Sequence, residues 1–435
     1  MTASSSPAPP PEVGAAGLES GKTLHFPCLD AFRFFAMMMV LVAHVTFATR
    51  PWVEAHVPNW GQAVLGRANL GVPIFFLLSG FLLFRPFIGR QLENRPPMRT
   101  RTYLRRRALR IFPGYWFALT ACVLFLGQLL GSARNAFLYY SLLFPFASPD
   151  VALGGGAGHE GDYGIPQAWS LSVEIVLYLM LPLVALYLVR RGAGKPHGTQ
   201  IRYALAATIV LFVVGQAFRL YFLTAHPSWE KVGAIMAPDW VDFFAIGMGL
   251  AVFSAWAEHG NPLPRVLQYL GDHPWVSWAI AAVFGFVCLT FRAPDLPYRY
   301  GAEYWFRSLL FAVVAFFLLV PAMFGDQTAG RARKVLASRP LVYLGTVSLG
   351  FYLFHLAILT NVQEWLAPAG VSGAFYGSLP TVLVLTFVLS VAAASISYWC
   401  VERPFLVLKD RPLRSVLHRR SGAAKAQAAK PVEAS

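Results

Sequence analysis

Two ionisable side chains interrupt a long apolar stretch near the start of the chain. Within residues 29–45, LDAFRFFAMMMVLVAHV, the ten residues FFAMMMVLVA separate Arg33 from His44. At the rise of an α-helix, the two side chains are about 16 Å apart along one axis. Because histidine titrates near neutral pH, it can take up and return protons. His44 is therefore the first candidate for proton chemistry.

A second apolar stretch, WSLSVEIVLYLMLP at residues 169–182, contains one carboxylate, Glu174. Ser170, Glu174 and Tyr178 follow each other at intervals of four residues, so a helix would carry all three on one face. The spacing predicts a polar stripe on an otherwise apolar helix.

An arginine-rich stretch, RTRTYLRRRALRIFPGYW, begins at Arg99 and leads into a further apolar run. Arg106 and Arg110 are four residues apart and share a helical face. Clustered guanidinium groups suit the bidentate binding of phosphate. Contact with anionic lipid head groups is the alternative, and the spacing alone leaves both open.

The composition is that of a polytopic membrane protein. Of 435 residues, 56% are hydrophobic and 13% are charged, about half the charged share of a soluble domain. The net charge of +15 could indicate a nucleic-acid partner, but basic cytoplasmic loops would explain it as well. The four cysteines are far apart, without metal-ligand spacing, and we expect free thiols and no metal site.

Ten apolar runs are long enough to cross a bilayer, so the predicted fold is an all-α bundle. The expected spans are 29–48, 69–88, 111–131, 169–189, 203–223, 239–256, 275–291, 304–324, 342–360 and 379–401. The segment 133–147 is apolar but short and contains Pro145, and we expect it to be re-entrant or interfacial.

The distribution of Lys and Arg indicates the direction of the spans. If the N-terminus is cytoplasmic, the inside segments hold 26 Lys and Arg residues and the outside loops hold 6. This asymmetry predicts that both termini are cytoplasmic and places the protein in the cytoplasmic membrane. It also accounts for most of the positive charge without nucleic acid.

Counting residues from the ends of the spans divides the polar side chains into two layers. Arg33 falls near the inner surface, whereas His44 falls about four residues and Glu174 about five residues from the outer one. Arg219, Asp242, Arg307 and His355 also fall in the outer third of their spans. Charged groups at mid-membrane cost about 2.5–3.5 kcal/mol each, so we expect a polar chamber open to the outside.

Six motifs in this order resemble the membrane-bound acyltransferase 3 family, which includes bacterial O-antigen acetylases. The motifs are Arg33 and His44 with their spacing, GVPIFFLLSGFLL (71–83), RRALRIFPGYW (106–116), WSLSVE (169–174), SLGFYLFH (348–355) and YWCVERPF (398–405). Many members have a second acidic residue where this chain has Ile175, and an aromatic residue where it has Leu177. Many also append an SGNH-type hydrolase domain, and here we expect a stand-alone form.

The resemblance covers roughly residues 24–405, which would form the acyltransferase domain between two disordered cytoplasmic tails, 1–23 and 406–435. It implies transfer of an acyl group, commonly acetyl from acetyl-CoA, to a hydroxyl of a carbohydrate or glycosylated acceptor. Acyl-CoA would be a co-substrate, with no permanently bound cofactor.

On this resemblance, His44 would deprotonate the hydroxyl or accept the acyl group. Glu174 would hold the imidazole, so we expect the two side chains to form a hydrogen-bonded pair. The proposed CoA-binding residues are Arg33, Arg106, Arg107 and Arg110, and the further site members are His355, Ser170, Tyr178 and Ser79.

Structural roles compete with these assignments. His44 or His355 could make a hydrogen bond between helices, and Ser79 could serve helix packing. Arg219, Asp242 and Arg307 could form plain ion pairs. A proton-coupled secondary transporter is the main rival function, since intramembrane ionisable residues suit it too. A lipid-phosphate glycosyltransferase would need acidic clusters in the loops, where only isolated Asp150, Glu160 and Asp162 are present.

The charge asymmetry predicts the side of the membrane on which each loop lies. Reporter fusions at Gly194 and Ser338 should report the cytoplasm, and a fusion at Gly158 should report the outside. A cytoplasmic Gly158 would show that segment 133–147 spans the membrane and reverses every later span.

Overall fold

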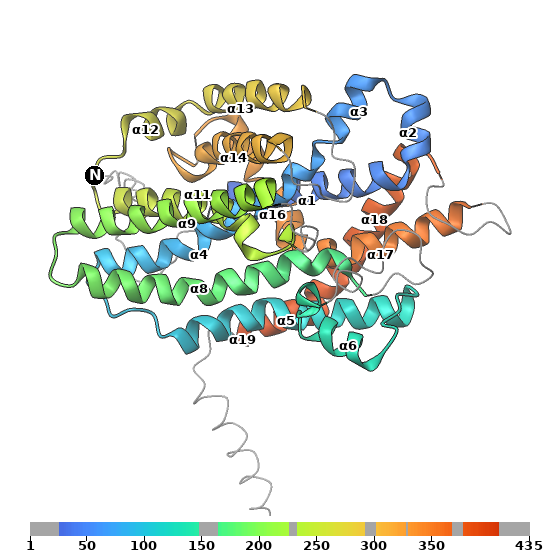
Figure 1. Ribbon diagram of the computed structural model, residues 1–435, viewed down its shortest axis with the longest axis horizontal. Helices are drawn as coiled ribbons and strands as arrows, with labels where there is room; N and C mark the ends of the chain where they lie inside the picture. The colour runs from blue at the N-terminus through green and yellow to red at the C-terminus, as the bar shows by residue number, and fades with distance from the viewer. Residues whose placement is uncertain are drawn as a thin grey trace, which may run out of the picture.

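The protein is a bundle of long helices that run side by side along its longest axis (Figure 1). The computed structural model describes residues 26–147, 164–225, 233–291, 302–327, 329–367 and 377–408. Within these residues the prediction of an all-α membrane bundle is confirmed.

Eight helices in the described part of the chain are long and apolar enough to cross a membrane. They are α1 (Pro27–Ala48), α4 (Gly71–Leu92), α5 (Thr100–Phe125), α8 (Trp169–Gly192), α9 (His197–Ala225), α11 (Ala237–Glu258), α14 (Ala302–Met323) and α18 (Leu379–Ser397). Two bent pairs are α12 (Arg265–Asp272) with α13 (Pro274–Leu289), at 99°, and α16 (Arg339–Thr346) with α17 (Ser348–Leu366), at 67°. If each pair is one span, the total is up to ten, at the predicted positions.

Short helices connect the long ones. Between α1 and α8 along the chain lie α2 (Arg50–His56), α3 (Asn59–Leu65), η1 (Ala68–Leu70), α6 (Ala133–Tyr140), η2 (Phe144–Phe146) and η3 (Pro166–Ala168). The remaining ones are α15 (Arg331–Leu336), the π-helix η4 (Tyr398–Glu402) and α19 (Arg403–Leu408). In Figure 1, α2, α3 and α6 gather at the right end of the bundle, whereas the α8–α9 connection lies at the left end.

Helix α6 does not span the membrane, because its eight residues reach only about 12 Å. It packs against α5, where Tyr115 and Trp116 donate hydrogen bonds to the carbonyls of Tyr139 and Tyr140. This agrees with the interpretation of 133–147 as a re-entrant or interfacial segment. Gly158, the loop acids at 150, 160 and 162, and both terminal tails (1–23 and all but the first residues of 406–435) lie outside the described residues.

Helices α4 and α11 make the closest crossing of the bundle through two glycines. A Cβ atom added to Gly80 would lie 2.0 Å from the carbonyl oxygen of Phe244, and one added to Gly247 would lie 2.0 Å from that of Leu77. Small residues let helix backbones approach in this way inside a membrane.

Helix α1 passes through the core and makes similar glycine contacts on two sides. Gly71 of α4 sits against the carbonyl of Ala36, and Gly345 of α16 sits against that of Asp30. The backbone of α1 is therefore held at two levels, which fixes the positions of Arg33 and His44.

The α4–α11 crossing predicts a strong position dependence for added methyl groups. Gly80→Ala should destabilise the protein, because the new Cβ meets a backbone oxygen and overpacking costs about 1–3 kcal/mol. Gly89→Ala, also on α4, has no atom within 4 Å of the new Cβ and should be neutral or stabilising. Thermal unfolding in detergent measures both, and equal transition temperatures would contradict this packing.

Candidate active site

His44 on α1 faces His355 on α17. The Nδ1 atom of His44 is 2.9 Å from the carbonyl oxygen of Val40 and 3.3 Å from Nε2 of His355. The two ring centroids are 5.1 Å apart. His355 is buried, with 1% of its surface exposed, and its Nδ1 lies 2.7 Å from the carbonyl oxygen of Tyr352.

The carbonyl partners determine which ring nitrogens carry protons. A carbonyl oxygen can only accept, so Nδ1 of each histidine must be the N–H donor. In neutral His355 the lone pair is then on Nε2, which accepts from the Nδ1–H of His44. In neutral His44 the lone pair is on Nε2, which has no hydrogen-bond partner among the described residues. The unused nitrogen of His44 is therefore a free base.

Tyr352, one turn before His355, ties α17 to the start of α8. Its hydroxyl donates to the carbonyl of Gln167 and lies 2.9 Å from Oγ of Ser170, which must then be the donor to it. The side-chain amide of Gln167 donates to the carbonyl of Leu353 at 2.8 Å. The sequence-level prediction missed Tyr352 and Gln167, although Tyr352 stands three residues before His355 within SLGFYLFH.

Glu174 makes its hydrogen bonds with side chains other than that of His44. Its Oε1 accepts a hydrogen bond from Ser79 of α4 at 2.7 Å, and its Oε2 accepts one from Tyr178 at 2.6 Å. Ser79 is therefore a donor to a carboxylate rather than only a packing residue. The expected His44–Glu174 hydrogen bond is wrong, since every hydrogen bond that these two side chains make goes elsewhere.

The helix rise shows how far apart the two groups are. Glu174 is seven residues beyond Gln167 along α8, and His355 is three residues beyond Tyr352 along α17, which runs in the opposite direction (Figure 1). Ten residues of helix amount to about 15 Å. The contact between Gly71 of α4 and Ala36 of α1 allows a second estimate. Ser79 follows Gly71 on α4 and His44 follows Ala36 on α1, and the summed helix rise places Ser79 and His44 about 24 Å apart along the bundle.

The reason for this offset is the segment that precedes α8. Residues 165, 167 and 168 are buried, so η3 lies inside the bundle rather than on its outer surface. Helix α8 therefore begins among buried residues, and Glu174 lies farther from His44 along the bundle than its distance from the end of the apolar run predicts.

Glu174 belongs to the inner, basic layer. Arg33 makes a 2.7 Å ion pair with Asp30 and lies within electrostatic reach of Glu174 and Arg110. Arg107 lies within reach of Glu174 and Tyr178, and its guanidinium sits over the ring of Tyr103. Two of the four predicted arginines, Arg33 and Arg107, thus lie near Glu174, and Arg110 lies near both of them. Arg106 lies one turn before Arg110 on α5.

A separate polar cluster lies between α9 and α11. Arg219, 1% exposed, pairs with Asp242 at 2.5 Å and with Asp239 at 3.1 Å. Gln216 also donates to Asp242, and Tyr304 donates to Asp239. The charges of Arg219 and the two aspartates are paired with one another, which favours the plain ion-pair interpretation of Arg219 and Asp242.

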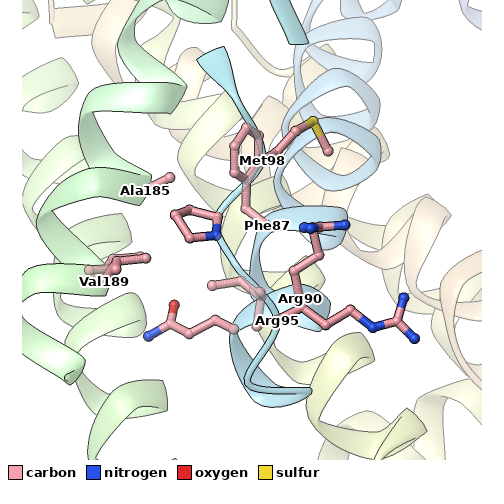
Figure 2. Close-up of a pocket in the computed structure, with 10 residues that line it drawn as sticks. Phe87, Arg90, Arg95, Met98, Ala185 and Val189 are labelled. Carbon is pink, nitrogen blue, oxygen red and sulfur yellow. The ribbon is translucent and has the colours of Figure 1, made fainter. Parts of the chain in front are cut away.

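A shallow recess opens at the inner end of the bundle (Figure 2). Phe87 and Arg90 of α4, Arg95 and Met98 of the following loop, and Ala185 and Val189 of α8 line it. Phe87 contacts Tyr103 edge to face, with centroids 5.2 Å apart. Since Tyr103 lies beneath Arg107, the recess adjoins the basic layer.

Residues 26–399 match the acyltransferase domain family, acyltransferase 3. The chain belongs to this family. The family match covers five of the six motifs and the first two residues of YWCVERPF, and it confirms the resemblance drawn from them. No solved structure matches the chain.

Relatives of this acyltransferase 3 member carry O-acetyltransferase names. "Putative peptidoglycan O-acetyltransferase YrhL" of Bacillus subtilis is 26% identical over 406 residues, covering 88% of this chain and 56% of the relative. O-acetyltransferase OatA of Staphylococcus aureus is 23% identical over 397 residues, covering 87% and 57%. Peptidoglycan O-acetyltransferase OatA of Listeria monocytogenes is 22% identical over 352 residues, covering 77% and 50%. The chain spans about half the length of these relatives.

Proposed function

We propose that this multi-pass membrane protein is an O-acyltransferase of the cytoplasmic membrane. It moves an acyl group, acetyl in the first instance, from acyl-CoA to a hydroxyl of a carbohydrate or glycosylated small molecule. The observation that carries the proposal is Nε2 of His44, a basic nitrogen without a partner on a ring whose other nitrogen is held. The family and the names of the relatives support acetyl transfer to a hydroxyl.

The reaction needs one base. Nε2 of His44 takes the proton of the acceptor hydroxyl while the hydroxyl oxygen attacks the thioester carbon. The C–O bond forms, the C–S bond breaks, and His44 returns the proton to the leaving sulfur. The products are an ester and free thiol, and the histidine ends neutral.

The basic layer suits the other end of the donor. Arg33, Arg107 and Arg110 could bind the phosphates of CoA, which reach the protein from the cytoplasmic side. Arg33 and His44 are eleven residues apart on α1, about 16 Å. An extended thioester arm would bridge this gap. Glu174 then balances the arginines and fixes the hydroxyls of Ser79 and Tyr178, instead of acting on His44.

The acceptor would approach from the outer end. Aromatic side chains stand exposed there, with Trp60 of α3 74% exposed and Trp365 of α17 67% exposed. Aromatic faces of this kind can pack on sugar rings or lie in the membrane interface. A transporter is less favoured, because both the family and its named members are transferases.

The activity depends on His44. Purified protein with acetyl-CoA and a glycan acceptor should release thiol and form an ester, both detectable by thiol titration and mass spectrometry. His44→Ala should lower the rate by about 10²–10⁴, because no other group supplies the base. His259→Ala is the control and should keep the rate, because the half-buried ring of His259 likewise bonds a carbonyl one turn back but lies at the C-terminal end of α11, away from the histidine pair. Near-normal transfer by His44→Ala would refute the mechanism.

Donor affinity depends on the basic layer. Arg33→Ala and the double variant Arg106→Ala/Arg110→Ala should weaken CoA binding by about 10- to 100-fold, the size of one or two charge-assisted hydrogen bonds. Arg50→Ala at the outer end, where Arg50 pairs with Glu54, should not change it. Isothermal titration with CoA measures each affinity. If every variant binds CoA as tightly as the wild type, these arginines do not bind the donor, and contact with lipid head groups explains them instead.

A further inference from the structure

We infer that His355 is the positioning residue of His44, and that it replaces the carboxylate that usually holds a catalytic imidazole. This inference rests on the proposed function of His44 as the base. The geometry that carries it is the 3.3 Å contact between Nε2 of His355 and Nδ1 of His44.

The direction of the contact follows from the neighbouring carbonyls. Nδ1 of His355 donates to the Tyr352 carbonyl, so the neutral ring offers its lone pair to His44. A protonated His355 would place a second N–H against the Nδ1–H of His44. The pair is therefore consistent only when His355 is a neutral acceptor.

The contact matters most during the reaction. When Nε2 of His44 takes a proton, the ring becomes a cation and its Nδ1–H becomes a stronger donor. The Val40 carbonyl and Nε2 of His355 then share that hydrogen, at 2.9 and 3.3 Å. A neutral imidazole stabilises the cation less than a carboxylate would. Burying a neutral imidazole, however, avoids the cost of burying a permanent negative charge in the membrane.

The surroundings hold the His355 ring in place. The Phe351 ring stacks on it, with an interplanar angle of 11° and centroids 6.1 Å apart. Tyr352, whose carbonyl accepts from His355, is itself anchored through its hydroxyl to Gln167 and Ser170. The start of α8 thereby sets the orientation of a ring on α17, which in turn orients His44 on α1.

Two substitutions separate positioning from packing. Glutamine at 355 can present an acceptor where Nε2 lies, whereas leucine has a similar size and no acceptor. His355→Leu should lower kcat by about 10²-fold, at the low end for acid–base catalysis, with KM values for donor and acceptor unchanged. His355→Gln should keep kcat within about tenfold of the wild type. His259→Leu is the control for loss of a histidine elsewhere and should keep the wild-type kcat.

A measurement that does not need activity tests the same contact. In the full chain with ¹⁵N-labelled histidine, the ring signals lost in His355→Leu should be those of a histidine protonated at Nδ1 and accepting a hydrogen bond at Nε2, and the Nδ1 signal of His44 should shift in the same variant. The opposite tautomer would overturn the inference. Wild-type kcat in His355→Leu, or equal loss in both variants together with lower thermal stability, would also overturn it. A wild type without acyl transfer would refute the proposed function, and the ring signals would still decide the role of His355.

Discussion

A polar group inside a membrane keeps a partner, because an unsatisfied donor or acceptor in hydrocarbon costs several kcal/mol. This constraint explains the polar interior of the bundle. Arg219 is enclosed by Asp239 and Asp242, and both oxygens of Glu174 accept from hydroxyls. The hydrogen bonds of Ser79 to Glu174 and of Tyr304 to Asp239 join helices that are distant in the sequence, so pairing the polar groups also determines which helices are neighbours.

The same constraint distinguishes structural clusters from reactive ones. The Arg219 cluster brings two carboxylates to one guanidinium and is closed by further donors from Gln216 and Tyr304. The histidine pair differs, because one nitrogen of His44 is left over after the backbone and His355 have fixed the other. The Arg219 cluster balances a cation with two carboxylates, whereas the histidine pair leaves the Nε2 lone pair of His44 without a hydrogen-bond partner among the described residues.

The spans were predictable from the sequence because hydropathy and charge asymmetry are properties of the chain alone. The same is true of the spacing of Arg33 and His44, which one helix fixes. The depth of Glu174 was not predictable, since it depends on η3 being buried beneath the outer surface. The sequence could not predict the hydrogen-bond partner of His44 either, because only tertiary packing around α4 and α16 brings α1 and α17 together.

The buried start of α8 places the carboxylate layer and the histidine pair at different depths, about 15 Å apart. On the proposed function, donor and acceptor would then enter through opposite ends and occupy separate volumes. Neither substrate would need to leave before the other arrives, so a ternary complex can form across the bilayer. The order of addition would be random, and the membrane itself would keep the thiol product on one side and the ester on the other.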